Sequence, residues 1–197
     1  NHTELKTTLK ALIDWIVTHD SSPEHPLKDR VNTNLLALTG HSLGGKLSFL
    51  AATEDQRVKA VFGIDPVDAQ GGPTERPRSE YPSVTPELMD RISVPVGVVG
   101  ETVNARCEGF FCQACAPEAD NFHQYFLHAV GPAWEIEILG ANHMSFLDMP
   151  SNAVCPAGTD DPQTTRRLTQ RYLTAFLNLI LLEDERYRTY LTGAAIE

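Results

Sequence analysis

Basic residues, long apolar runs and cysteines are all scarce in this 197-residue chain. Only 16 Lys and Arg stand against 26 Asp and Glu, which gives a formal net charge of −10. Because nucleic acids and anionic membranes bind Lys and Arg, this balance argues against nucleic acid as a partner and disfavours docking on an anionic bilayer. No apolar run approaches the roughly 20 residues that a membrane span requires, so we expect no span.

The four cysteines are Cys107, Cys112, Cys115 and Cys155. They allow two disulfides with three possible pairings, which the sequence leaves open. Disulfides would imply an oxidising compartment, so a secreted or periplasmic location is favoured if they form. Free thiols are one alternative. Zinc is another, but the four cysteines lack the paired spacing of a zinc ribbon.

Helical and strand patterns alternate along the chain, without internal repeats. Strands that read as continuous apolar runs and alternate with helices predict an α/β fold, with a parallel sheet covered by helices on both faces. The expected elements are, in chain order, a helix at 3–19, a strand at 34–39, a helix at 43–52, strands at 58–64 and 94–99, a helix at 118–130, a strand at 134–139 and a helix at 164–182.

The letters GHSLG at residues 40–44 match the G-x-S-x-G nucleophile elbow, between an expected strand and an expected helix. In such an elbow the chain turns sharply and presents the serine hydroxyl, here that of Ser42. We expect the flanking glycines to avoid Cβ clashes with neighbouring backbone. The backbone N–H of Leu43 would be one oxyanion donor. Chemistry of this kind needs no metal and no cofactor.

An alcohol is a weak nucleophile near neutral pH, so Ser42 needs a base and an acid that orients the base. His143 follows the fourth expected strand directly, whereas the other histidines precede the elbow, lie in it or fall on a helix. Asp65 ends the second strand and is the favoured acid. Asp68, three residues on, and Glu101, just past the third strand, remain alternatives.

Four short segments are informative together: GHSLGGK at 40–46, GIDPVD at 63–68, CAP at 115–117 followed by NFH at 121–123, and NHM at 142–144. In combination they resemble the chlorophyllase family over roughly residues 30–150. The resemblance implies an α/β-hydrolase that cleaves carboxylic esters, with Ser42 as nucleophile, Asp65 as acid and His143 as base. The family's namesakes remove phytol from chlorophyll. Leu43 stands where plant chlorophyllases usually carry Arg, and lipases, cutinase-like and dienelactone-type hydrolases are alternatives that act on other esters.

Apolar side chains surround His143 in the sequence and also occur in the cysteine-rich loop. If both loops fold over the strand ends, they form a pocket for a small-molecule or lipid-like ester with a long or aromatic group. Packing beneath long loops is the alternative explanation. The pocket candidates are Met144, Phe146, Leu147, Phe110 and Phe111, with Met149 nearby.

In this fold the elbow normally follows a fifth strand, but one helix and one strand precede Ser42 in this chain. We therefore expect one domain over 1–197 that corresponds to the C-terminal half-sheet of about four strands. We expect this domain to lack the N-terminal strands and the loop with the second oxyanion donor. No signal-peptide pattern is present, and the chain begins at Asn1 rather than Met.

A missing N-terminal segment or a second chain would complete the sheet beside 34–39, which is otherwise an exposed apolar edge. A fold does not secure an activity. A non-catalytic binding module on a hydrolase scaffold is therefore the alternative from another functional class.

Overall fold

The structure, a computed structural model, describes residues 1–70, 76–107, 114–149 and 155–192. In these residues, none of the helices is both long and apolar enough to cross a membrane. The elements are α1 (His2–Asp20), β1 (Leu36–His41), α2 (Leu43–Ala52), β2 (Val58–Ile64), the 3₁₀ turn η1 (Met89–Arg91), β3 (Val96–Glu101), α3 (Phe122–Leu127), β4 (Ala133–Ile138), α4 (Pro162–Leu181) and the 3₁₀ turn η2 (Glu185–Tyr190).

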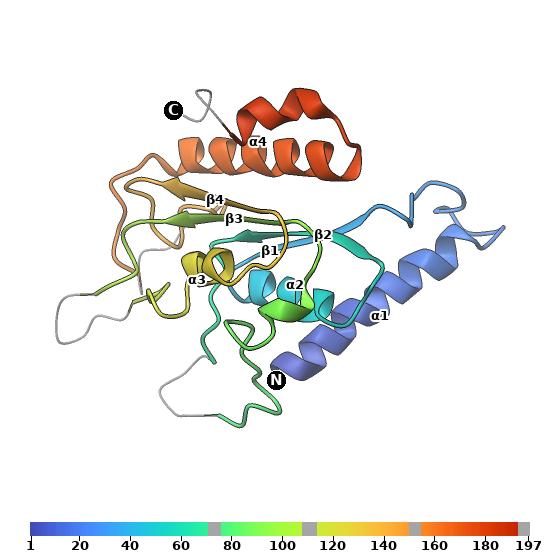
Figure 1. The fold of residues 1–197 in the computed structure, drawn as a ribbon, viewed down its shortest axis with the longest axis horizontal. Coiled ribbons are helices and arrows are strands. Elements are labelled where there is room, and N and C mark those ends of the chain that lie inside the picture. Colours follow the sequence, from blue (N-terminus) through green and yellow to red (C-terminus); the bar gives the residue numbers. More distant parts are fainter. Residues whose placement is uncertain (71–75, 108–113, 150–154, 193–197) are drawn as a thin grey trace.

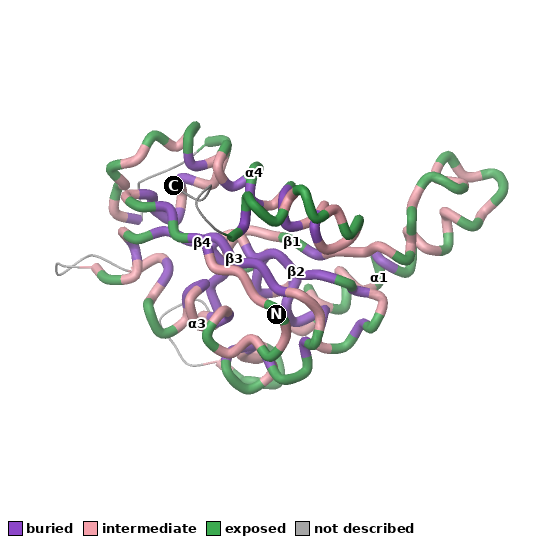
Figure 2. Tube along the Cα trace, turned by 45° about the horizontal axis from the view of Figure 1, so that its top comes forward, coloured by how far each residue is buried: buried purple, intermediate pink, exposed green. Residues whose placement is uncertain are grey.

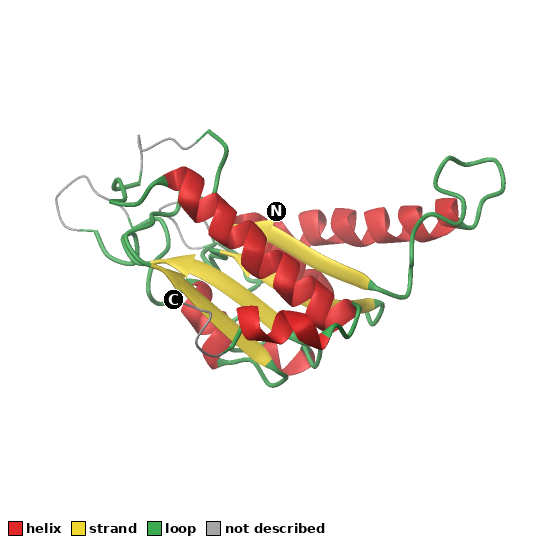
Figure 3. Cartoon of the chain, turned by 90° about the horizontal axis from the view of Figure 1, so that it is seen from above, coloured by secondary structure: helices red, strands yellow, loops and turns green. Residues whose placement is uncertain are grey.

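The four strands form one parallel sheet in the order β1-β2-β3-β4. Helices α1, α2 and α3 lie on one face, and α4 lies on the other with η2 beside it (Figures 1 and 3). The predicted parallel sheet with helices on both faces is therefore confirmed. Because all strands run in one direction, their carboxyl ends meet at one edge, where sites form in such folds.

Each face of the sheet carries its own core, which Figure 2 shows as buried chain along the strands. Neighbouring residues of a strand point to opposite faces, and Val61 and Phe62 of β2 illustrate this. Val61 belongs to the core beneath α2 and α3, and Phe62 to the core beneath α4, where its ring lies 5.3 Å from that of Phe176. Strands β2 and β3 are therefore packed against helices on both faces of the sheet.

Polar side chains near the element ends move several boundaries away from the predicted ones. Asn32 accepts a side-chain hydrogen bond from the Asn34 backbone, and this turn delays β1 to Leu36. Helix α3 covers only the middle of the predicted helix at 118–130. The reason is a turn from Pro117 to Asp120, after which the side chain of Asn121 caps the helix through the backbone of His123.

Strand β1 forms an edge of the sheet that the described residues build. It pairs with β2 on one side, and Leu36 and Ala37 are only partly buried while Thr39 is exposed. This edge is the one predicted at 34–39, and it begins two residues later than expected. The strand that leads to Ser42 thus has unpaired backbone groups on its outer side among the described residues.

Candidate active site

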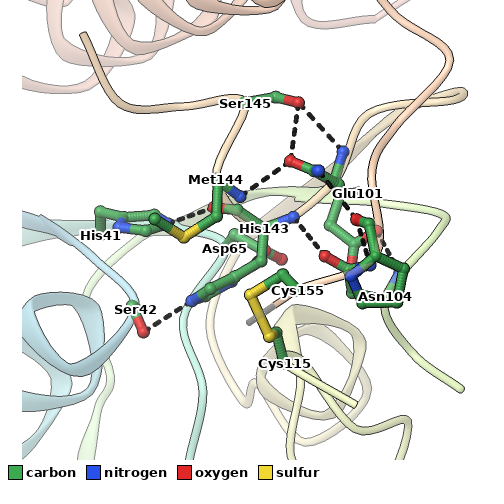
Figure 4. Close-up of a disulfide and its surroundings, with 12 residues drawn as sticks. His41, Ser42, Asp65, Glu101, Asn104, Cys115, His143, Met144, Ser145 and Cys155 are labelled. Atoms are coloured by element: carbon green, nitrogen blue, oxygen red, sulfur yellow. Dashed lines mark hydrogen bonds and ion pairs between the residues drawn. A yellow bond between two sulfur atoms is a disulfide. The ribbon is translucent and has the colours of Figure 1, made fainter. Parts of the chain in front are cut away.

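Polar residues gather where the four strands end (Figure 4). Ser42 follows β1, Asp65 follows β2 and Glu101 is the last residue of β3, while His143 lies in the loop after β4. Asp65 and Glu101 are 0% and 2% exposed, and His143 is 7% exposed. The site is therefore a buried cluster of titratable groups at one sheet edge.

Ser42 has φ +54° and ψ −121°, a conformation that costs energy for any residue with a side chain. Its backbone N–H donates to the carbonyl of Ile64 on β2 (3.0 Å), and its carbonyl accepts from the N–H of Lys46 (3.1 Å). Leu43 begins α2, so its N–H is one of those at the helix start that have no partner within the helix. A sharp turn of this kind matches the one that the elbow predicts.

The glycines around Ser42 have different roles. A Cβ on Gly40 would lie 2.4 Å from the carbonyl carbon of Gly44, and one on Gly45 would lie 2.8 Å from the Cβ of Pro66. A Cβ on Gly44 would meet nothing within 4 Å among the described residues. The expectation that both flanking glycines avoid backbone clashes is thus correct for Gly40 and wrong for Gly44, and Gly45 is the second glycine that close packing requires.

We expect Gly40→Ala to destabilise the protein by about 1–3 kcal/mol or more, because its methyl group would overlap the backbone of α2. Gly44→Ala is the matched control. It should be neutral or stabilising by up to about 1 kcal/mol, because Ala favours the helix. Urea unfolding of both variants, followed by circular dichroism, measures the difference. Equal losses in the two variants would contradict the steric explanation.

Hydrogen bonds connect the three residues proposed from the sequence. Nδ1 of His143 lies 2.6 Å from Oδ2 of Asp65, and Nε2 of His143 lies 2.9 Å from Oγ of Ser42. A carboxylate can only accept. With an ionised Asp65, Nδ1–H therefore donates to the carboxylate, and Nε2 is left to accept the hydroxyl proton of Ser42. This arrangement can deprotonate an alcohol and stabilise the imidazolium that results.

His41, the second residue of the elbow motif, contacts both the ring and the backbone carbonyl of His143. The two rings stack with centroids 4.6 Å apart, and Nε2 of His41 lies 2.8 Å from the carbonyl oxygen of His143. Burial and the nearby His143 lower the pKa of His41. A neutral ring must therefore carry its proton on Nε2 to donate to that carbonyl. Sequence reasoning placed His41 in the motif without a role.

Two buried asparagines fix the loop that carries His143. Asn104 Oδ1 accepts from the backbone N–H of His143 (2.9 Å), and its Nδ2 donates to the carbonyl of Pro156 (3.1 Å). Asn142 Nδ2 donates to the same carbonyl (2.9 Å), and its Oδ1 accepts from the N–H of Met144 (3.0 Å). The loops after β3 and β4 are thereby tied together. The sequence gives no local signal for this network.

Asp68, one of the rival acids, does not hydrogen-bond His143. Its carboxylate pairs with Lys46 (3.1 Å) and accepts from the hydroxyl of Ser83 (2.7 Å) and the N–H groups of Val84 (2.9 Å) and Thr85 (2.8 Å). The Lys46 and Asp68 side chains are both 0% exposed. The pair connects α2, which begins directly after Ser42, to the chain segment just after Asp65, and sequence reasoning missed it.

Glu101, the other rival, lies in the cluster but bonds to the backbone of its own loop. Its Oε2 accepts from the N–H groups of Val103 and Asn104, the latter at 2.7 Å. Burial, and secondly the charge of Asp65, raise the pKa of Glu101 to about 7. Of the three candidate acids, Asp65 is the one that contacts the ring of His143.

The apolar pocket candidates after His143 divide between core and surface. Phe146 packs against the core beneath α4, and its ring centroid lies 5.9 Å from that of His41. Met144 and Leu147 are half-buried. Met149 is 86% exposed. Phe146 is therefore part of the packed core, whereas Met144, Leu147 and Met149 are at least partly exposed to solvent.

The cysteine-rich loop is only partly described, because Phe110, Phe111 and Cys112 lie outside the described residues. Cys115 and Cys155 form a disulfide across 40 residues, with Cα atoms 5.7 Å apart. This bond joins the loop after β3 to the loop after β4, beside the asparagine network (Figure 4). The expectation of disulfides is confirmed for this pair. Cys107 is disulfide-bonded as well, and no described cysteine is free.

In the described part of the chain, the residues that could together ligate a metal are His41, Asp65 and His143, whose ligand atoms lie within 4.8 Å of one another. Both ring nitrogens of His143 are already engaged by Asp65 and Ser42. A metal ion here would therefore compete with the hydrogen-bond chain instead of adding to it.

Comparison with known proteins identifies one family. The family model described as Chlorophyllase matches residues 1–192. The chain is 28% identical over 199 residues to "Chlorophyllase-2" of Arabidopsis thaliana, covering 93% of this chain and 61% of that protein. It is 30% identical over 165 residues to "Chlorophyllase-1, chloroplastic" of Citrus unshiu, covering 77% of this chain and 47% of that protein. The chain thus spans about half to three fifths of the length of these relatives.

Proposed function

This chain belongs to the chlorophyllase family, and from that premise we propose that it contributes the catalytic serine, acid and base of a carboxylic-ester hydrolase. The observation that carries the proposal is the unbroken hydrogen-bond chain from Ser42 through His143 to Asp65. The strained backbone of Ser42 and the helix start at Leu43 support it. The four-stranded parallel sheet is that of a partial α/β-hydrolase fold.

The reaction proceeds through an acyl-enzyme. Oγ of Ser42 attacks the ester carbonyl while its proton passes to Nε2 of His143. Asp65 stabilises the imidazolium, and the N–H of Leu43 donates to the developing oxyanion. The imidazolium then protonates the leaving alcohol. Water, deprotonated by His143, releases the acid and regenerates Ser42.

For the substrate we propose an ester of a long apolar alcohol, such as the phytyl ester of a chlorophyll-type pigment. The names of the relatives support this class, and so do the half-buried Met144 and Leu147 beside His143. A lipase-like or cutinase-like esterase is the second candidate, because the residue after the serine is the aliphatic Leu43, which is 37% exposed. Hydrolysis rates for short-chain and long-chain esters of one acid distinguish the two.

We also propose that a segment or chain outside these 197 residues completes the sheet beside β1 and supplies the second oxyanion donor. The unpaired outer side of β1 and the greater length of the relatives support this. In this arrangement the described domain holds the nucleophile, acid and base, and the added strands hold the rest of the oxyanion hole.

A fluorophosphonate probe tests the proposed function, because it reacts with serines that a base and an oxyanion hole activate. We expect mass spectrometry to locate the label on Ser42, and we expect Ser42→Ala and His143→Ala to abolish it. Ser93→Ala, at an exposed serine, is the control and should label like the wild type. No label on the folded chain, either alone or within a longer form that completes the sheet beside β1, would refute the hydrolase and favour a binding module.

A further inference from the structure

Two buried carboxyl groups end neighbouring strands at the site. Asp65 directly follows β2 and Glu101 ends β3, and these strands pair in parallel, with Ile64 opposite Val99. The N–H of Asp65 donates to the carbonyl of Val99 at 2.6 Å. The two carboxyl groups therefore leave adjacent strand ends, and both are almost fully buried.

Each of these carboxyl groups has one oxygen without a hydrogen-bond donor among the described residues. They are Oδ1 of Asp65 and Oε1 of Glu101. Two ionised carboxylates at one buried site repel each other, and each unpartnered oxygen adds a desolvation cost. A proton on Glu101 removes one of the two charges and converts one unpartnered acceptor into a donor.

Glu101 is also joined to the catalytic base through its other oxygen. Oε2 accepts from the N–H of Asn104, and the side chain of Asn104 accepts from the N–H of His143. The carboxyl group thus holds the asparagine that fixes the position of His143. Asn104 is 0% exposed, so this link is shielded from water.

We propose that Glu101 is a positioning residue for the base: its carboxyl group is neutral in the resting site at mildly acidic pH, and its ionised form supports the imidazolium that His143 becomes during catalysis. The inference rests on the proposed function. The raised pKa of Glu101, about 7, agrees with the neutral form. The charge of His143 lowers that pKa, so loss of the Glu101 proton and gain of a proton by His143 favour each other.

A cavity gives the proton of Glu101 a way to exchange with solvent. Its volume is about 420 Å³, and it is lined by groups of the β3 loop, α3 and β4. Asp65 and His143 are the charged groups whose electrostatic influence reaches Glu101. The other charged or titratable groups around the cavity are Arg106, Glu118, His123 and Glu137. Arg106 pairs with Glu118, and His123 pairs with Glu135.

The test compares Glu101→Gln with the wild type. Gln keeps an oxygen for the two N–H groups but carries no charge at any pH. We expect equal kcat/KM at pH 6, where Glu101 is protonated. Above pH 7 we expect the wild type to be faster by about tenfold or more, the order of effect for one added charge within about 10 Å at an effective dielectric near 20. Glu137→Gln, a carboxyl on the same cavity, is the control and should keep the wild-type profile.

Stability and infrared measurements give readouts that do not need activity. A folded pKa above the unfolded value means that the contribution of Glu101 to the stability of the wild type falls as pH rises from about 4.5 to about 7. The Tm of Glu101→Gln relative to the wild type should therefore rise across this range, on the order of 5 °C. The C=O stretch of a protonated carboxyl should be present at pH 6 in the wild type and absent in Glu101→Gln.

Parallel rate profiles of the two proteins at all pH values would overturn the proposal, as would an infrared spectrum without the protonated carboxyl. A wild type that hydrolyses no ester and takes no label at Ser42 would refute the proposed function instead. In that case the infrared band and the Tm difference still decide the protonation state of Glu101.

Discussion

Asp65→Asn is expected to lower kcat for ester hydrolysis by about 10⁴-fold, with little change in KM. The carboxylate accepts from Nδ1–H of His143 at 2.6 Å and fixes the tautomer in which Nε2 faces Ser42. An amide can present an N–H to the ring instead, which favours the tautomer whose Nε2 cannot take the proton of Ser42. Initial rates with a soluble ester, at several substrate concentrations, separate kcat from KM.

Asp148→Asn is the matched control for this substitution. Asp148 lies five residues after His143, its side chain is fully exposed, and it contacts Arg166 at 3.7 Å. We expect its kcat to stay within twofold of the wild type. If Asp65→Asn kept more than about a tenth of the wild-type rate while folding normally, the assignment of Asp65 as the acid would be wrong.

Lys46→Met is expected to lower the free energy of unfolding by about 3–5 kcal/mol, because it leaves the carboxylate of Asp68 buried without its cation. Lys46 Nζ also donates to the carbonyl of Asp68 at 2.7 Å, and this bond is lost too. Both side chains of the pair are fully buried, so water cannot replace the cation. Chemical denaturation at neutral pH measures the loss.

The exposed pair between Arg78 and Glu87, 2.9 Å apart with side chains 69% and 51% exposed, provides the control. Arg78→Met should change the free energy of unfolding by less than about 1 kcal/mol, because water screens such pairs. A similar loss from both substitutions would mean that the Lys46–Asp68 pair stabilises no more than a surface pair. Lys46→Met should also slow the probe reaction at Ser42, since Lys46 connects α2, which begins directly after Ser42, to the segment after Asp65.

Local sequence patterns predicted the elements around the site well. The helix at 43–52 and the strand at 58–64 have the bounds that were expected, because uninterrupted apolar runs and the elbow motif specify them. Boundaries shifted where polar side chains form turns and caps, as Asn32 does before β1 and Asn121 before α3. Such contacts depend on the geometry of single side chains, which a periodicity does not contain.

The choice among the three acids required the fold. Asp65, Asp68 and Glu101 all follow strands in the sequence, so position alone ranks them only weakly. In the structure, Lys46 and the segment at 83–85 engage Asp68, and the amides of its own loop engage Glu101. Asp65 is the candidate that hydrogen-bonds His143, 78 residues away in the sequence.

By itself, the sequence determined the parallel sheet and pointed to Ser42 and His143 as the proposed nucleophile and base, because a motif between a strand and a helix is a local feature. Only the tertiary structure decided the partners of the buried groups: the Lys46–Asp68 pair, the Cys115–Cys155 bond and the contact of Asn104 with His143. The reason is physical. A buried polar group must find its partner within hydrogen-bond reach, and the register and packing of the strands determine which partner that is.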